Sequence, residues 1–259
     1  MMSVRVVLCC ALCLFAIRSA DAGPLDDGAA NYRPYMIEGI GSALDGARNL
    51  RDRAAAGDLS GAKDAWISAR AGWERSEVFT TGFVPELDAE IDAWPHATSG
   101  FHTIEAALFG SGRTDIGPDA DKLVDDLKNL HDKLHDMPLT PQGLLDGTVR
   151  LAYEVGESKA DGGESRISGT SLDDMRSNVA GIDFAYHTIF APSLRNADAR
   201  LADAIDARIA QLKAIVAAPD LQHIDVTQLR RASEELVITL QDASGKLGLH
   251  RSTLEAASQ

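Results

Sequence analysis

The feature that most constrains the fold is a helical repeat of apolar residues along most of the chain. In one segment, for example, Leu59, Ala62, Trp66, Ala69 and Trp73 recur at intervals of three and four residues. This spacing places them on one face of an α-helix, which must be buried against other elements. Gly, Pro and capping residues interrupt the pattern and predict about eight amphipathic helices. The predicted ranges are 32–56, 58–81, 98–109, 118–138, 140–161, 170–192, 196–218 and 226–247.

The composition also favours helices over sheets. Aromatic residues make up only 5% of the chain, and the abundant Ala, Leu and Arg lose little side-chain freedom in a helix. Four predicted helices precede Pro138 and four follow it, with no low-complexity linker between the two sets. We therefore predict an all-α protein of two tandem, closely packed four-helix bundles, residues 23–138 and 139–259, with a cleft between them.

The first 22 residues match the pattern of a secretory signal peptide. Arg5 precedes an apolar stretch from Val6 to Ile17, and small residues follow as far as Ala22, after which we expect cleavage. None of the three cysteines follows the small residue that lipoprotein processing requires. All three lie within this segment, so the cleaved protein would have no thiol for a disulfide or a metal. The sequence therefore predicts a protein exported to the periplasm.

Charge and motif content exclude several classes of function. The formal net charge of −14 disfavours a polyanionic partner, so we expect no binding of nucleic acid. No later stretch of about 18 apolar residues predicts a membrane-spanning helix. Neither a Gly-x-Ser-x-Gly motif, a P-loop nor a dinucleotide-binding fingerprint is present, which leaves nucleophilic hydrolysis and nucleotide binding without support.

His102 and Glu105 form the most informative short motif. They are three residues apart in a predicted helix, so both side chains project from one face and can bind one metal ion through an imidazole nitrogen and a carboxylate. A helix cap, or a hydrogen bond between the two side chains, is the commoner reason for such a pair. The spacing alone therefore permits a metal site without requiring one.

Two further carboxylates are candidate ligands. Glu77 continues the apolar face of the second predicted helix, four residues after Trp73. A buried carboxylate needs a cation, a hydrogen-bonding partner or a metal, and an ion pair with Arg70 or Arg75 is the simple alternative. Asp121, early in the fourth predicted helix, would add another oxygen ligand, although acidic residues in a first turn usually interact with the helix dipole.

Three blocks of residues carry a resemblance to a known family. The first block contains Ala69, Arg70, Trp73, Glu74, Arg75 and Glu77, followed by Leu87, Asp88, Ile91 and Asp92. The second contains Gly100, Phe101, His102, Glu105, Leu108, Phe109 and Gly110, followed by Ala120, Asp121 and Leu123. The third contains Glu154, Val155, Ser158, Lys159, Gly162, Glu164, Arg166, Ser168, Thr170, Leu172, Asp174, Asn178, Val179 and Gly181. In their residues, order and spacing these blocks resemble the imelysin-like family, specifically the periplasmic iron-uptake proteins of the EfeO/EfeM type.

The resemblance implies two tandem four-helix bundles and a metal site near the His102–Glu105 helix. It also implies a protein that binds iron and works with an inner-membrane iron permease and a haem peroxidase. The cupredoxin domain of the long members is not found, so the chain resembles the short type. Where the family pattern reads Ser-His-Thr-Asp-Leu, this chain has Gly169 and Ser171 in place of the His and the Asp. If the lost His and Asp are metal ligands in the family, a metal site is weakened or missing in this chain. If they only cap a loop, the substitutions change little.

We therefore expect a periplasmic metal carrier or metallochaperone with His102, Glu105, Glu77 and Asp121 as ligands. Oxygen ligands with one imidazole suit iron or manganese better than copper(I), and zinc or another divalent ion stays open. One alternative is a protein that binds a polysaccharide or another ligand in the cleft. The other is an imelysin-like metallopeptidase, which needs an open coordination position and a general base that His-x-x-Glu does not supply. We expect no enzymatic activity.

Overall fold

The computed structural model describes residues 23–94, 96–160 and 162–254. These residues form helices and connecting turns, with no strand among them, which confirms the all-α prediction. The predicted signal peptide, residues 1–22, lies outside the described residues. The α-helices are α1 (Pro24–Ala55), α2 (Leu59–Glu74), α3 (Thr80–Phe83), α4 (Pro85–Asp92), α5 (Gly100–Glu105), α6 (Gly117–Leu134), α7 (Pro141–Gly156), α8 (Ser171–Ala185), α9 (Ala191–Ala197), α10 (Ala199–Val216) and α11 (Val226–Lys246). Two π-helical turns, η1 (Ala106–Gly110) and η2 (Tyr186–Phe190), follow α5 and α8, and a 3-10 turn, η3 (Leu221–His223), precedes α11.

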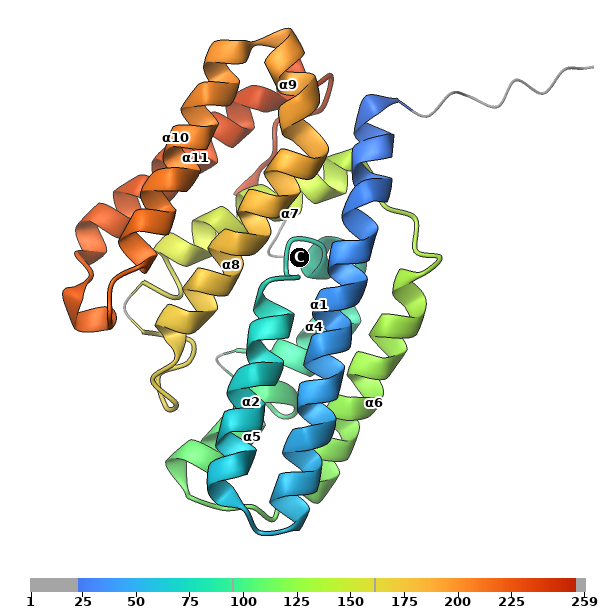
Figure 1. The fold of residues 1–259 in the computed structure, drawn as a ribbon, viewed down its shortest axis with the longest axis vertical. Coiled ribbons are helices and arrows are strands. Elements are labelled where there is room, and N and C mark those ends of the chain that lie inside the picture. Colours follow the sequence, from blue (N-terminus) through green and yellow to red (C-terminus); the bar gives the residue numbers. More distant parts are fainter. Residues whose placement is uncertain (1–22, 95, 161, 255–259) are drawn as a thin grey trace, which may run out of the picture.

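The helices pack as two neighbouring groups (Figure 1). In the first group α1 packs along α2 and α6, and α4 and α5 also contact α6. In the second group α11 packs against α7 and α10, and α8 packs against both α7 and α10. The two groups meet mainly where α2 contacts α8 and where α1 contacts η2. The division at residue 138 into two separate bundles stays a prediction.

The apolar stripes predicted from the sequence form the core. On α6, for example, Leu123, Leu127, Leu130 and Leu134 are completely buried, whereas the residues on the opposite face of the helix are exposed to solvent. The burial of such stripes supplies most of the stability of short helices, which are marginal in isolation. No helix in the described part of the chain combines the length and the apolar character needed to cross a membrane.

The second predicted helix is shorter than expected. It ends at Glu74 instead of reaching residue 81, and a turn of residues 75–79 leads into α3 and α4. The backbone carbonyl groups released at this end accept hydrogen bonds from side chains of later helices: Asn178 Nδ2 donates to Glu74 O at 2.8 Å, and Arg150 Nη2 donates to Glu77 O at 2.9 Å. These side chains cap the helix end, and the local sequence does not reveal them.

Two other helices extend beyond their predicted ends. α1 begins at Pro24 rather than Tyr32, because proline fits the first helical turn, where no backbone N–H is needed. The helix expected to end near Pro192 continues as α9 to Ala197. The π-helical turn η2 ends two residues before this proline, and a widened turn accommodates a ring that would clash in a regular α-helix.

Candidate metal centre

A buried cluster of charged side chains lies where α2, α4, α5 and α8 meet the loop of residues 157–170. A pocket of about 740 Å³ opens beside it and is lined by His102, Glu105 and Glu164 together with the exposed side chains of Trp94 and Ile167. The cluster is therefore accessible from solvent on one side. Its acidic members are Glu74, Glu77, Asp92, Glu105, Glu164 and Asp174, and its other members are Arg70, Lys159, Asn178 and His102.

Arg70 joins three helices at the centre of the cluster. Its side chain is only 1% exposed. The guanidinium contacts Glu74, one turn later on α2, and Asp92 at the end of α4, while Nε lies 3.6 Å from Asp174 Oδ2 on α8. It also lies over the ring of Phe101, 5.5 Å from the centroid. A buried guanidinium is tolerated only when its charge is paired, so Arg70 and its carboxylates depend on one another.

Lys159, in the turn after α7, is the second buried cation. Its Nζ lies 2.5 Å from Glu74 Oε2, 2.8 Å from Glu164 Oε2 and 3.3 Å from Glu77 Oε2. Asn178 on α8 donates from Nδ2 to both Glu74 Oε2 and Glu77 Oε2 at 2.8 Å. The partners of Glu77 therefore come from the C-terminal half of the chain rather than from the arginines near it in sequence.

His102 lies between two carboxylates. Its Nδ1 is 3.0 Å from Glu105 Oε2, as the spacing of three residues predicts. Its Nε2 is 3.3 Å from Asp92 Oδ1 but forms no regular hydrogen bond there. The other oxygen of Glu105 accepts hydrogen bonds from the backbone N–H and the hydroxyl of Ser168, both at 2.7 Å. A nearly buried imidazole nitrogen without a hydrogen bond, beside a carboxylate, is a good position for a metal ligand.

Acidic groups outnumber basic ones in this cluster. Among the described residues, six carboxyl groups surround one guanidinium, one ammonium and one imidazole. A second buried guanidinium, that of Arg150, lies beside Glu77 but pairs with Glu154. Carboxylates removed from water without a counter-charge must take up a proton or meet another cation. Oxygen atoms of Glu74, Glu77 and Asp92 lie within 4.8 Å of one another, close enough to bind a single ion.

The pKa shifts in the cluster reflect this excess of negative charge. Burial and the neighbouring Glu74 carboxylate raise the pKa of Glu77 well above its usual range. Burial and Glu74 also raise the pKa of Asp174, to about 7. For Asp92, burial favours the neutral form, but Arg70 outweighs burial and holds the pKa below its usual range. Burial thus favours the protonated forms of Glu77 and Asp174, and a bound cation would favour release of these protons.

His102 should make the stability of the metal-free protein depend on pH. Burial and Arg70 disfavour the protonated imidazole, but Asp92 and Glu105 outweigh them and raise the pKa of His102 from 6.5 to about 9. Protonation therefore stabilises the folded state. This contribution is complete below pH 6.5 and is lost as the pH rises through 9. We expect this group to lower the free energy of unfolding by about 3 kcal/mol across that interval.

Urea unfolding between pH 6 and 9.5 in the presence of a chelator measures this effect. The His102→Gln variant should lose most of the decline. The matched control is His187→Gln, since His187 stands in a similar Tyr-His-Thr-Ile segment but is 47% exposed. An equal decline in the wild type and in His102→Gln would contradict the prediction.

The structure brings together three of the four ligands predicted from the sequence. His102, Glu105 and Glu77 belong to the buried cluster, but Asp121 does not. Asp121 lies on α6 with its side chain 65% exposed, and its carboxylate lies 3.8 Å from a guanidinium nitrogen of Arg51. Asp121 is the fifth residue of α6, just beyond its first turn, and it is a surface charge that is not part of the candidate site.

Reasoning from single residues missed most of the cluster. No spacing or helical face singled out these residues, because their partners are distant in sequence. Each of them nevertheless stands in one of the three blocks that carry the family resemblance, and the first and third blocks meet in the cluster. Membership in these blocks was therefore the only indication in the sequence that the residues belong to one site. The missed residues are Arg70 as the central cation, and Glu74, Asp92, Lys159, Glu164, Asp174 and Asn178.

The two departures from the family pattern lie in the loop that binds Glu105. Ser168 donates to Glu105, and Gly169 follows it with a φ of 77°, a conformation that favours glycine. Ser171 begins α8 and is completely buried, with no hydrogen bond to its hydroxyl among the described residues. Ser168, which matches the family pattern, thus keeps its bonds to Glu105, whereas positions 169 and 171 present no side chain and a neutral hydroxyl in place of an imidazole and a carboxylate.

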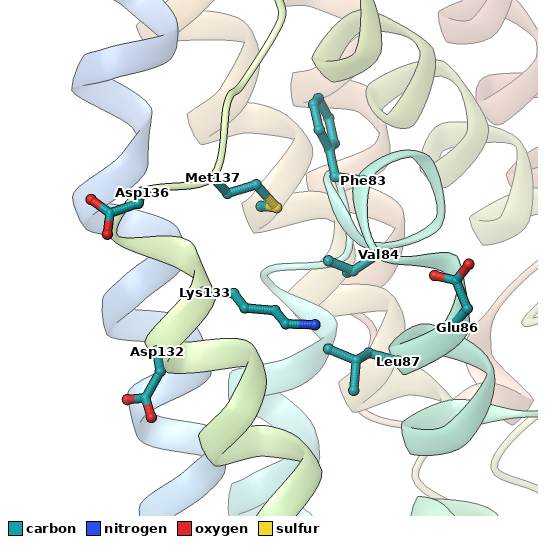
Figure 2. A pocket seen from close by; sticks show the side chains of 8 residues that line it. All are labelled: Phe83, Val84, Glu86, Leu87, Asp132, Lys133, Asp136 and Met137. Carbon is teal, nitrogen blue, oxygen red and sulfur yellow. The ribbon is translucent and has the colours of Figure 1, made fainter.

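A second pocket is separate from this cluster (Figure 2). It has a volume of about 470 Å³ and lies between the end of α6 and the segment containing α3 and the start of α4. Phe83, Val84, Leu87 and Met137 supply its apolar lining, and Lys133 extends across it toward Leu87. Its three carboxylates, Glu86, Asp132 and Asp136, do not belong to the group of converging ligand atoms found among the described residues.

Comparison with known protein families identifies the family of this chain. The family model described as Imelysin matches residues 29–99 and 96–247. The chain belongs to the imelysin family. The matched residues include every member of the charged cluster, from Arg70 to Asn178, so the cluster lies within the part of the chain that defines this family.

Several relatives within the family have names that refer to iron. The chain is 30% identical over 205 residues to the iron uptake system component EfeM of Pseudomonas syringae pv. syringae, across 75% of this chain and 70% of that protein. It is 33% identical over 189 residues to an Efem/EfeO family lipoprotein of Staphylococcus aureus (strain NCTC 8325 / PS 47), across 67% of this chain and 64% of that protein. The match to the staphylococcal protein thus covers slightly less than two thirds of its length.

A solved structure shares the fold of this chain. The crystal structure of a protein described as an iron-regulated protein A precursor from Parabacteroides distasonis superposes with a TM-score of 0.68. The superposition covers 86% of this chain and 95% of that one, at 15% sequence identity. At this level of identity the likeness concerns the fold alone.

Proposed function

We propose that this imelysin-family protein is a metal-binding component of an iron-uptake system, which acts in the periplasm as a carrier or metallochaperone. Asp92, Glu74 and Glu77, whose oxygens lie within 4.8 Å of one another, would bind the ion. His102 would add Nε2 beside Asp92, and Glu105, on the Nδ1 side of the imidazole, would hold the ring or bind from the pocket side. The names of the relatives EfeM and EfeO support the assignment to iron uptake. As partners we propose an inner-membrane iron permease and a haem peroxidase, which the family resemblance implies.

The excess of buried carboxylates over buried cations carries this proposal. A cluster that only stabilised the fold would be expected to balance its charges, since each unpaired buried carboxylate costs free energy. Here six carboxyl groups among the described residues face only three basic side chains, Arg70, Lys159 and His102. Burial and the neighbouring Glu74 raise the pKa values of Glu77 and Asp174, so protons make up part of the missing positive charge. An incoming cation would take the place of those protons. The adjoining pocket of about 740 Å³ provides a path from solvent.

Iron suits the chemistry of these ligands. Carboxylate oxygens with one imidazole favour iron or manganese over copper(I), which prefers sulfur, and zinc would bind as a competitor. His102 must lose its proton to bind a metal, and the carboxyl groups with raised pKa must do the same. The apparent affinity should therefore rise about tenfold per pH unit for each proton released.

We propose a carrier rather than an enzyme. Hydrolysis at a metal requires an open coordination position and a base that activates bound water. The carboxylates nearest His102, Glu105 and Asp92, are held in place by Ser168 and Arg70, an arrangement that suits fixed ligands better than a base that must take up a proton from water. A polysaccharide site would require several exposed aromatic surfaces. Of the described residues that line the pocket, only Trp94 is a Trp, Tyr or Phe, so the geometry favours the metal ion over a sugar.

Metal binding to the purified protein tests this function. Calorimetry and metal analysis with Fe(II) under anaerobic conditions, Fe(III), Zn(II) and Cu(II) would establish stoichiometry and selectivity. The indole of Trp73 donates to Asp92 Oδ2 at 2.7 Å, so its fluorescence should report binding at this carboxylate. We expect one iron per chain. The variants His102→Gln and Glu105→Gln should each lose at least about 100-fold in iron affinity. Replacing a residue that only hydrogen-bonds to a metal ligand already costs about 10–100-fold.

Two variants serve as controls. His187→Gln removes an exposed histidine in a similar local sequence, and Asp121→Asn removes an acidic group outside the cluster. Both should bind iron as the wild type does. Binding that exceeds one ion per chain and is unaffected by His102→Gln would show attraction by surface charge only, and would overturn the proposal.

A further inference from the structure

Lys159 occupies an unusual position for a lysine. Its side chain is completely buried, although lysine normally keeps its ammonium in water. The three oxygen atoms around Nζ belong to Glu74, Glu77 and Glu164, at 2.5, 3.3 and 2.8 Å. These carboxylates come from α2, the turn after α2 and the loop of residues 157–170. The ammonium is thus held inside the acidic cluster by ion pairs, two of which are also hydrogen bonds to Glu74 and Glu77.

The ammonium lies where a metal bound by the same oxygens would lie. Divalent metal ions bind carboxylate oxygens at about 2.0–2.6 Å, and Nζ is 2.5 Å from Glu74 Oε2. Two cations cannot share this space, because both steric overlap and charge repulsion oppose it. A metal that uses Glu74 and Glu77 must therefore displace the lysine side chain.

We propose that Lys159 is a built-in competitor of the metal, which lowers the affinity of the cluster so that a bound ion can be handed on. This inference rests on the proposed function. The metal-free protein keeps its carboxylates paired with the ammonium and remains folded without iron. When the metal enters, the flexible stem of Lys159 swings toward the pocket, which the neighbouring Ser158 and Glu164 line. On release, the ammonium returns to the carboxylates.

Variants of Lys159 test this inference. In Lys159→Met the competing charge is absent, so we expect iron to bind about 100-fold more tightly, comparable with the loss of one partner from a buried ion pair. The rise in melting temperature on adding iron should also exceed that of the wild type. Lys159→Arg keeps a permanent charge and adds bulk, so we expect iron to bind at least about 10-fold more weakly. Lys122→Met removes an exposed lysine that pairs with Glu90 and Asp126, and should change neither quantity.

A second measurement needs no substitution. In the metal-free wild type the buried amine of Lys159 should resist acetylation by a water-soluble reagent, whereas iron should make it reactive, as mass spectrometry of the peptides would show. If Lys159→Met does not fold, Lys159→Arg and the acetylation experiment decide the question. Iron binding that is unchanged or weaker in folded Lys159→Met, unchanged in Lys159→Arg, or without effect on acetylation would overturn the inference.

The outcomes separate this inference from the proposed function. Iron binding by the wild type that depends on His102, together with unchanged affinity in the Lys159 variants, would leave the proposed function intact and remove only the competing role of Lys159. Absence of His102-dependent binding in the wild type would overturn both.

Discussion

Arg70→Met is expected to lower the free energy of unfolding by about 3–5 kcal/mol at pH 7, the range for breaking a buried ion pair by removing one partner. The guanidinium of Arg70 contacts Glu74 and Asp92 and lies close to Asp174. Methionine has a similar length but no charge, so these carboxylates would lose their main counter-ion while remaining buried. Urea unfolding of the metal-free protein at constant pH measures the effect.

The pH dependence of this variant distinguishes charge from packing. Without Arg70 the pKa values of the remaining carboxyl groups should rise, so the variant should lose stability relative to the wild type as the pH increases from 5 to 8. Arg48→Met is the matched control, because Arg48 pairs with Asp45 at 3.0 Å on the surface. It should cost no more than about 0.5 kcal/mol. A large loss in Arg70→Met that is the same at pH 5 and pH 8 would assign the effect to packing.

Gly147→Ala is expected to destabilise the protein by about 3 kcal/mol, at the upper end of the usual cost of overpacking. A Cβ at position 147 would lie 1.7 Å from the backbone oxygen of Val78. Backbone cannot move aside as easily as the end of a flexible side chain, so the turn of residues 75–79 would have to shift. Glu77 lies in this turn, and iron binding should therefore weaken together with stability.

Thermal and urea unfolding of Gly147→Ala, with iron titration of the folded fraction, tests this expectation. Gly245→Ala provides the comparison, because Gly245 lies in α11 and its added Cβ would meet no heavy atom of the described residues within 4 Å. That substitution should stabilise the protein by up to about 1 kcal/mol, the difference in helix propensity. Wild-type stability in Gly147→Ala would mean that α7 and the turn of residues 75–79 are not in close contact at this glycine.

Local spacing predicted the parts of the site that depend on local geometry. The interval of three residues between His102 and Glu105 predicts their contact, which lies within one helical turn. Glu77 was identified as a buried carboxylate although α2 does not extend to it. Its partners, Lys159 and Asn178, lie 82 and 101 residues further along the chain. No helical periodicity can indicate contacts over such distances, so the identity of these partners required the tertiary structure.

The helical periodicity of α6 could have excluded Asp121 from the predicted ligands. The buried face of α6 contains Leu123, Leu127 and Leu130. On a helix Asp121 points away from that face, and the same periodicity that predicted the helix would have placed it in solvent. The turn of residues 75–79 differs, because the bonds from Asn178 and Arg150 that fix it come from α8 and α7. Local propensity cannot predict such a helix end.

The long separations within the cluster also have a kinetic consequence. Ser168 and Glu105 are 63 residues apart, Lys159 and Glu74 are 85 apart, and Asn178 and Glu74 are 104 apart. Contacts between residues so far apart in sequence form late in folding, because closing the long loop between them costs conformational entropy. An ion bound by the cluster would stabilise contacts that are mostly absent from the transition state. It should therefore slow unfolding and leave the rate of folding nearly unchanged.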